Sequence, residues 1–140
     1  MKSTTFVILW TILFVLFGFY VNNKLYDFTE GYKDNISVLE KSIENEDWEK
    51  AQKEADSIST SWNKEKNHWY KVLNHEYFDE IGLRFNILDK AIYTENKLKS
   101  LEEVESIKTY LGNIIESVKF DVNYICLLYT SPSPRDQRGS

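Results

Sequence analysis

The two histidines are the residues whose neighbours could do chemistry, because each stands at helical spacing from a carboxylate. Glu65 precedes His68 by three positions, the spacing of one half of a di-iron site in a helical bundle. The second half of such a site is missing, since Val72 stands three positions before His75. His75 and Asp79 share a helical face, where such a pair can hold a metal weakly or respond to pH. Acidic residues at a helix start explain that pair more simply, and we predict no metal and no cofactor.

Other kinds of reaction centre are missing from the sequence. The hydroxyls of Ser57, Ser59, Thr60 and Ser61 have no base at a predictable distance, and no glycine-rich loop offers a phosphate cradle. Cys126 is the only cysteine, which rules out a disulfide or a cysteine metal site within one chain. The net charge of −5 argues against a nucleic-acid partner. We therefore predict a protein that is not an enzyme and that binds no nucleic acid.

The stretch 47–73 carries three of the four tryptophans and the clearest helical pattern. Its apolar residues recur at alternating intervals of three and four, with one polar position skipped near Glu65 and Lys66. They are Trp48, Ala51, Ala55, Ile58, Trp62, Trp69 and Val72. A tryptophan in such a position usually belongs to a core. Trp69 differs because it follows the polar run 64–68 and stands near the helix end. We predict that Trp69, together with His75 and Glu76, contacts a partner or a ligand.

The same spacing predicts helices on both sides of this stretch. The predicted helices run to about Ile43, from Asp47 to about Leu73, from about His75 to Ile92, and from Ser100 to about Val118. Asp47 is a suitable N-cap for the second helix. Ser100 and Glu103 have the spacing of a capping box that would open the fourth. We therefore predict an all-α fold in which the first helix continues from the N-terminal segment.

Part of the sequence recurs 49 positions later. Leu39-Glu-Lys-Ser-Ile43 matches Leu88-Asp-Lys-Ala-Ile92, and the same register aligns residues 50–60 with 99–109. Two copies of helix, turn and helix would form either a four-helix bundle or two tetratricopeptide-like αα-hairpins. Chance similarity between amphipathic helices would give the same pattern, and the count of four helices holds in either case.

The two ends of the chain differ from its middle. Residues 1–22 are predicted to be an N-terminal membrane anchor, because residues 4–21 are uncharged and would span about 27 Å as a helix. A cleaved signal peptide is the alternative, but it would need a small-x-small cleavage site that is missing. A signal anchor would place residues 23–125 at the cell membrane as an extracytoplasmic helical domain. Residues 126–140 resemble a translated sequencing adapter, and we predict a disordered, non-native tail.

Several of these features together resemble one family. They are the pair Asn22-Asn23 after the anchor, Glu46-Asp-Trp48-x-x-Ala51, Trp62-x-x-x-Lys66-x-x-Trp69 and His75-Glu76. Over roughly residues 1–122 the chain resembles the bacterial family known as domain of unknown function 4363. The resemblance implies a membrane-anchored, mostly helical extracytoplasmic domain, and it carries over no catalytic residue.

The anchor, the helical pattern and the resemblance lead to two functional predictions. The first is a membrane-anchored helical interaction or scaffold domain that is an accessory to a membrane protein or associates with itself. The alternative is an extracytoplasmic ligand-sensing or binding module that uses Trp69, His75 and Glu76.

Overall fold

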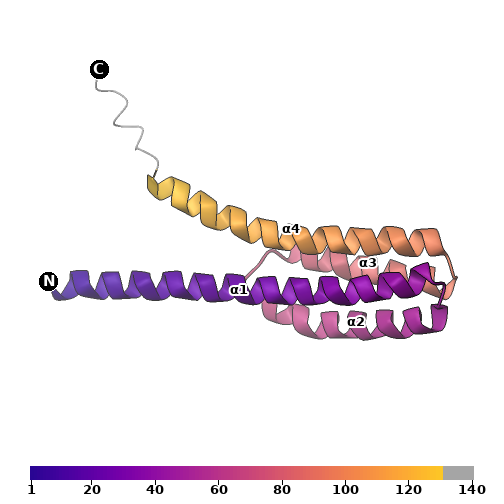
Figure 1. Cartoon of the computed structure of the whole chain (residues 1–140). Coiled ribbons are helices and arrows are strands. Elements are labelled where there is room, and N and C mark those ends of the chain that lie inside the picture. Colours follow the sequence, from indigo (N-terminus) through magenta and orange to yellow (C-terminus); the bar gives the residue numbers. More distant parts are fainter. Residues whose placement is uncertain (131–140) are drawn as a thin grey trace, which may run out of the picture.

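A computed structural model of the chain contains four α-helices that form one bundle, and it describes the backbone of residues 1–130 and the side chains of residues 1–119. The helices are α1 (Lys2–Glu44), α2 (Trp48–Trp69), α3 (His75–Tyr93) and α4 (Lys97–Thr130) (Figure 1). Consecutive helices run antiparallel, and α4 closes the ring by packing against α1 (Figure 1). The all-α prediction is confirmed, and of its two predicted forms the structure adopts the four-helix bundle.

The core forms from one face of each helix, at positions that the spacing of three and four predicts. Val72 is an exception, because it lies beyond the end of α2 and is 61% exposed. The members of the core are Leu25, Tyr32, Ile36, Leu39, Ile43, Ala51, Ala55, Ile58, Trp62, Phe78, Ile81, Phe85, Leu88, Ile92, Val104, Ile107, Leu111 and Ile114. The largest of them is Trp62, which is 0% exposed. Its ring centroid lies 5.2–6.1 Å from those of Phe28, Tyr32, Phe78 and Phe85. Rings from α1 and α3 thus meet on one side chain of α2, which links three helices.

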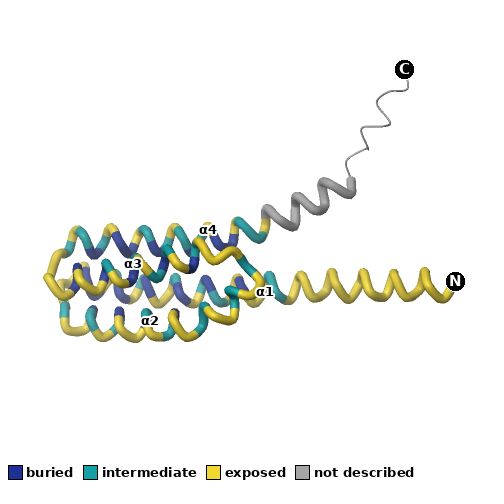
Figure 2. Tube along the Cα trace, turned by 180° about the vertical axis from the view of Figure 1, so that it is seen from behind, coloured by how far each residue is buried: buried dark blue, intermediate teal, exposed yellow. Residues whose placement is uncertain are grey.

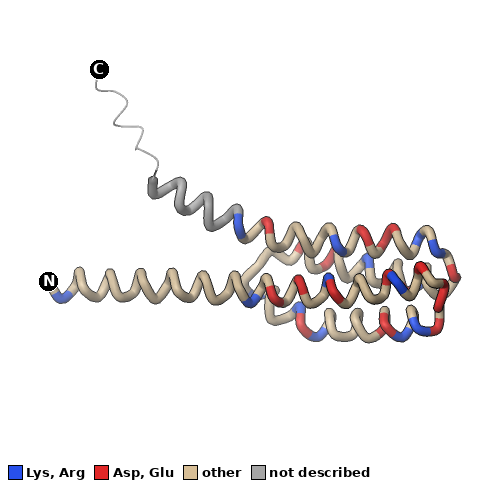
Figure 3. The backbone as a smooth tube through the Cα atoms, viewed as in Figure 1, with Lys and Arg blue, Asp and Glu red and all other residues tan. Residues whose placement is uncertain are grey.

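The helix α1 has two parts of different character. Residues 1–20 are exposed throughout, and Figure 2 shows this half of the helix extending away from the bundle. Burial begins at residue 21 and is nearly complete at Leu25. Residues 3–23 carry no charge (Figure 3), and in the described part of the chain only α1 is long and apolar enough to cross a membrane. Gly31 does not interrupt α1, so one unbroken helix joins the apolar half to the bundle.

The α1–α2 and α3–α4 turns repeat the same hydrogen bonds 49 residues apart. In both turns a residue with left-handed backbone follows the helix and donates its N–H to a carbonyl three residues back, and a side chain then caps the next helix. The equivalent residues are Glu46 and Glu95 (φ 59° and 54°), the acceptors Ile43 and Ile92, and the caps Asp47 and Asn96. The shared geometry supports an internal repeat in which α1–α2 and α3–α4 are copies of one αα-hairpin.

Two helix ends differ from the prediction. The helix α2 ends at Trp69 rather than near Leu73, and the residues after it form a turn in which the Val72 N–H donates to the Trp69 carbonyl oxygen, three residues back, at 3.0 Å. The helix α4 continues past Cys126, where the sequence predicted that the helical pattern stops. The rest of the predicted tail, residues 131–140, lies outside the described residues.

The predicted capping box at the start of α4 is wrong. The helix begins at Lys97, and the Asn96 side chain accepts a hydrogen bond from the Lys99 N–H at 3.0 Å. Ser100 therefore lies inside the first turns, where its hydroxyl donates to the Asn96 carbonyl oxygen at 2.8 Å. Glu103 is buried and pairs with Lys99 instead of reaching back to Ser100. Asn96 is the N-cap because it immediately precedes the first helical residue, Lys97, whereas Ser100 lies inside the helix.

Candidate functional site

The α2–α3 connection, residues 70–74, lies at the end of the bundle from which the N-terminal half of α1 extends (Figure 1). The residues predicted to contact a partner flank this connection. Trp69 ends α2 and is half-buried, with its ring centroid 5.5 Å from that of Phe28 on α1. His75 begins α3, and both it and Glu76 are exposed. The three residues therefore lie at one end of the bundle, but Trp69 is packed against the core.

Tyr70, the first residue of this connection, contacts residues of both α2 and α3. Its hydroxyl donates a hydrogen bond to the Asp79 carboxylate, and its ring stands edge-on to His75 and Phe78 at 5.0 and 5.8 Å. The Lys66 ammonium lies 5.6 Å from the centroid of the same ring, within the range of a cation–π contact. Burial, followed by the bond to Asp79, raises the pKa of the Tyr70 phenol to about 12. The phenol is therefore neutral at physiological pH and joins the start of α3 to the end of α2.

Sequence reasoning missed Tyr70 and paired Asp79 with His75 instead. In the described residues no ion pair joins His75 to Asp79, because the carboxylate accepts its hydrogen bond from Tyr70. Tyr70 directly follows Trp69 and falls off the helical spacing of α2, so periodicity gave it no role. The contact also crosses a non-helical connection whose path no local spacing predicts.

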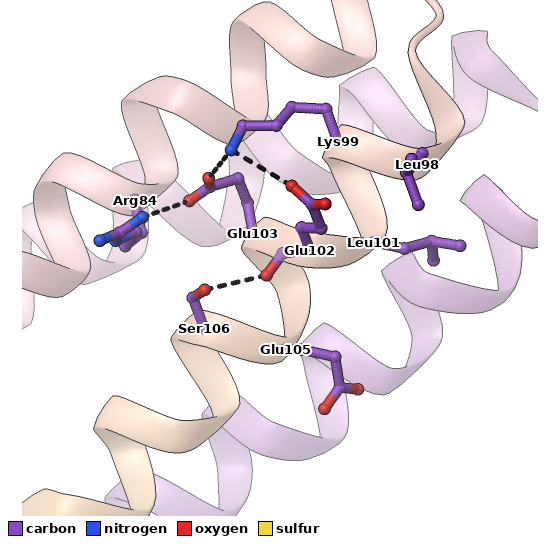
Figure 4. A pocket seen from close by; sticks show the side chains of 8 residues that line it. All are labelled: Arg84, Leu98, Lys99, Leu101, Glu102, Glu103, Glu105 and Ser106. Atoms are coloured by element: carbon purple, nitrogen blue, oxygen red, sulfur yellow. Dashed lines mark hydrogen bonds and ion pairs between the residues drawn. The ribbon is translucent and has the colours of Figure 1, made fainter.

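A shallow hollow of about 570 Å³ lies away from the α2–α3 connection, between Arg84 on α3 and the first turns of α4 (Figure 4). Glu103, which is 1% exposed, points into it. Its carboxylate accepts from Lys99 at 2.8 Å and from Arg84 at 3.3 Å, and Arg84 also pairs with Glu80 at 3.0 Å. A buried carboxylate is tolerated only when it is paired in this way.

The cations around this hollow are already neutralised by carboxylates of the bundle. The hydrogen bonds that Arg84 donates to Glu80 and, next in size, to Glu103 raise the pKa of its guanidinium, and the bond that Lys99 donates to Glu103 raises the pKa of Lys99. Both cations therefore stay charged, and both have carboxylate partners among the described residues. The cluster stabilises the α3–α4 contact and offers no unpaired cation for a substrate.

A second hollow, of about 390 Å³, lies between α2 and α3 and is lined by Asp56 and Asp89. The Gln52 side-chain amide donates hydrogen bonds to both carboxylates and so bridges the two helices. Glu65, from the candidate half-site for iron, accepts a hydrogen bond from the Ser61 hydroxyl at 3.3 Å. Among the described residues no group of three or more His, Cys, Asp or Glu side chains is arranged to hold a metal ion.

These observations define an all-α protein in which an exposed apolar helix continues without a break into a four-helix bundle. The family described as domain of unknown function (DUF4363) matches residues 19–125, and the chain belongs to this family. The matched region includes the whole α1–α2 hairpin from Phe19 onward, α3, and α4 as far as Ile125. No curated protein and no solved structure matches the chain.

Proposed function

We propose that the chain is a membrane-anchored interaction domain whose bundle docks onto an integral membrane protein as an accessory. Residues 1–22 would cross the cell membrane, and the bundle would stand outside the cytoplasm, as expected for a signal anchor. The observation that carries the proposal is the continuity of α1, which is one helix from Lys2 to Glu44. An anchor joined by a flexible linker would leave the bundle free to tumble.

A continuous helix instead holds the bundle at a fixed height and in a fixed orientation relative to the anchor. Such an arrangement suits a protein that presents one surface to a neighbour in the same membrane. The hollows of the bundle are shallow and lined by paired charges, which suits a docking surface better than a substrate pocket. The proposed role is therefore a binding one and does not involve catalysis.

Ligand sensing at the α2–α3 connection is the second candidate function. It is favoured by the exposed His75 imidazole beside Tyr70. It is weakened by Trp69, whose ring packs on Phe28 and so does not stand open for a ligand to stack on. A thermal-shift screen with metal ions and cell-wall fragments tests this function. A shift that His75→Ala abolishes would favour ligand sensing over protein docking.

Photo-crosslinking of the whole chain in its native cells tests the proposed docking. His75 is a suitable probe position because it is exposed at the membrane-facing end, whereas a probe at half-buried Trp69 would disturb the core. Tyr93, which is 83% exposed at the opposite end of α3, is the matched control. We expect the probe at 75 to trap a discrete integral membrane protein that the probe at 93 does not trap. Adducts only between copies of the chain would replace docking by self-association, and no adduct at 75 would contradict the proposal.

A further inference from the structure

The α2–α3 connection exposes apolar surface that the bundle does not explain. Val72 is 61% exposed, and Lys71 beside it is exposed as well. The neighbouring aromatic residues point inward, since Trp69 packs on Phe28 and Tyr70 on Phe78. The turn is nevertheless well defined, because the Val72 N–H donates to the Trp69 carbonyl oxygen at 3.0 Å. An ordered turn therefore holds an aliphatic side chain outward at the end of the bundle.

The distance of this turn from the membrane can be measured along α1. The apolar half of α1 ends near Tyr20, and Lys24, the next charged residue, lies 5.9 Å from the Tyr20 ring centroid. Tyrosine and lysine at the end of a span are typical of the membrane–water interface. Phe28, which the Trp69 ring contacts, is eight residues after Tyr20 and so about 12 Å farther along the helix.

The chain then runs from Trp69 toward the membrane rather than away from it. The helix α2 is antiparallel to α1, so residues 70–73 lie on the membrane side of Trp69 (Figure 1). The headgroup layer on each side of a bilayer is roughly 5–8 Å thick. A turn that begins at the level of Phe28 and continues toward the end of the bundle from which the anchor extends therefore faces that layer (Figure 1).

We propose that residues 70–73 rest in the headgroup layer of the same bilayer that holds the anchor, with Val72 inserted and Lys71 at the phosphates. An exposed aliphatic residue beside an exposed lysine suits an interfacial segment, because the aliphatic side chain can enter the acyl boundary while the ammonium stays among the phosphates. Together with α1 this contact would give the bundle two points of attachment and fix its tilt. The inference rests on the proposed anchoring and adds to it a surface that recognises lipid.

Depth-dependent quenching on the full chain in phosphatidylcholine–phosphatidylglycerol vesicles tests this inference. A Cys126→Ser background removes the one native cysteine, and Val72→Cys then carries an environment-sensitive fluorophore. Tyr93→Cys, at the opposite end of α3, carries the same label as the control. Both positions are exposed in the bundle, so neither substitution should disturb folding. Iodide in the water and nitroxide on the lipid headgroups are the two quenchers, and vesicle flotation reports membrane attachment.

We expect the label at 72 to be several-fold less accessible to iodide than the label at 93, and to be quenched by the headgroup nitroxide. The vesicles contain no second protein, so this result would assign the contact to lipid rather than to a partner. If the protein floats with the vesicles but iodide reaches both labels equally, the inference is overturned while the anchoring stands. If the protein does not float with the vesicles, the anchoring and the inference fail together.

Discussion

Replacing Trp62 by alanine removes the largest side chain of the core, and we expect a large loss of stability. Trp62 is fully buried, and its ring stacks at 5.7 and 5.6 Å on Phe28 and Phe78. A buried tryptophan removes about 150–250 Å² from water, worth roughly 4–6 kcal/mol at about 25 cal/mol per Å². The alanine side chain keeps a small part of this burial free energy, so we expect the free energy of unfolding to fall by about 3–5 kcal/mol.

Urea unfolding of the full chain in detergent micelles, followed by far-ultraviolet circular dichroism, measures this change. Trp48→Ala is the matched control, because Trp48 begins the same helix but is only half-buried, and we expect it to cost about 1–2 kcal/mol. The Trp62 indole N–H has no hydrogen-bond partner among the described residues, so Trp62→Phe loses ring area but no hydrogen bond and should cost about 1 kcal/mol. If Trp62→Ala costs no more than Trp48→Ala, the aromatic cluster does not hold the bundle together.

Three further predictions concern the polar contacts. Glu103→Gln should lower the free energy of unfolding by about 1–3 kcal/mol, because it removes the buried negative charge that Arg84 and Lys99 share. The more exposed Glu80→Gln should cost less in the same urea experiment. Asn96→Ala should cost about 1 kcal/mol and Ser100→Ala clearly less, and equal losses would contradict the assignment of Asn96 as the N-cap. The pKa of Tyr70 is raised to about 12 in the folded state. The contribution of its phenol to folding stability is therefore complete below the unfolded pKa of about 10, and it is lost as the pH rises through 12. Tyr70→Phe should remove that part of the alkaline dependence, as measured by thermal unfolding over this pH range.

The sequence predicted the helices and the core because one physical pattern determines both. Residues such as Ile36, Leu39 and Ile43 recur every three or four positions, and burial of that face decides where each helix lies. The choice between a closed bundle and two tetratricopeptide-like αα-hairpins depends on whether α4 packs on α1, a contact between the first and the last helix. No local spacing encodes that contact.

Two local features were missed for different reasons. Asn96 and Ser100 both have side chains that can cap a helix, and Ser100 fitted a familiar motif better. The repeat could have decided between them, because Asn96 stands 49 positions after Asp47, the N-cap of α2. Tyr70 was missed because its partner Asp79 lies across a non-helical connection, where sequence periodicity carries no information.

Extraction of cell membranes with alkaline carbonate tests the central claim, that the N-terminal half of α1 holds the bundle to a membrane. The matched variant carries both Leu13→Arg and Leu16→Arg, at positions that are exposed in the structure and make no contribution to the bundle core. Each arginine near the middle of a span costs about 2.5–3.5 kcal/mol of insertion free energy. We predict that the native chain stays in the membrane pellet, and that the variant moves to the supernatant with its helical circular dichroism retained. Release of the native chain into the supernatant would contradict the account.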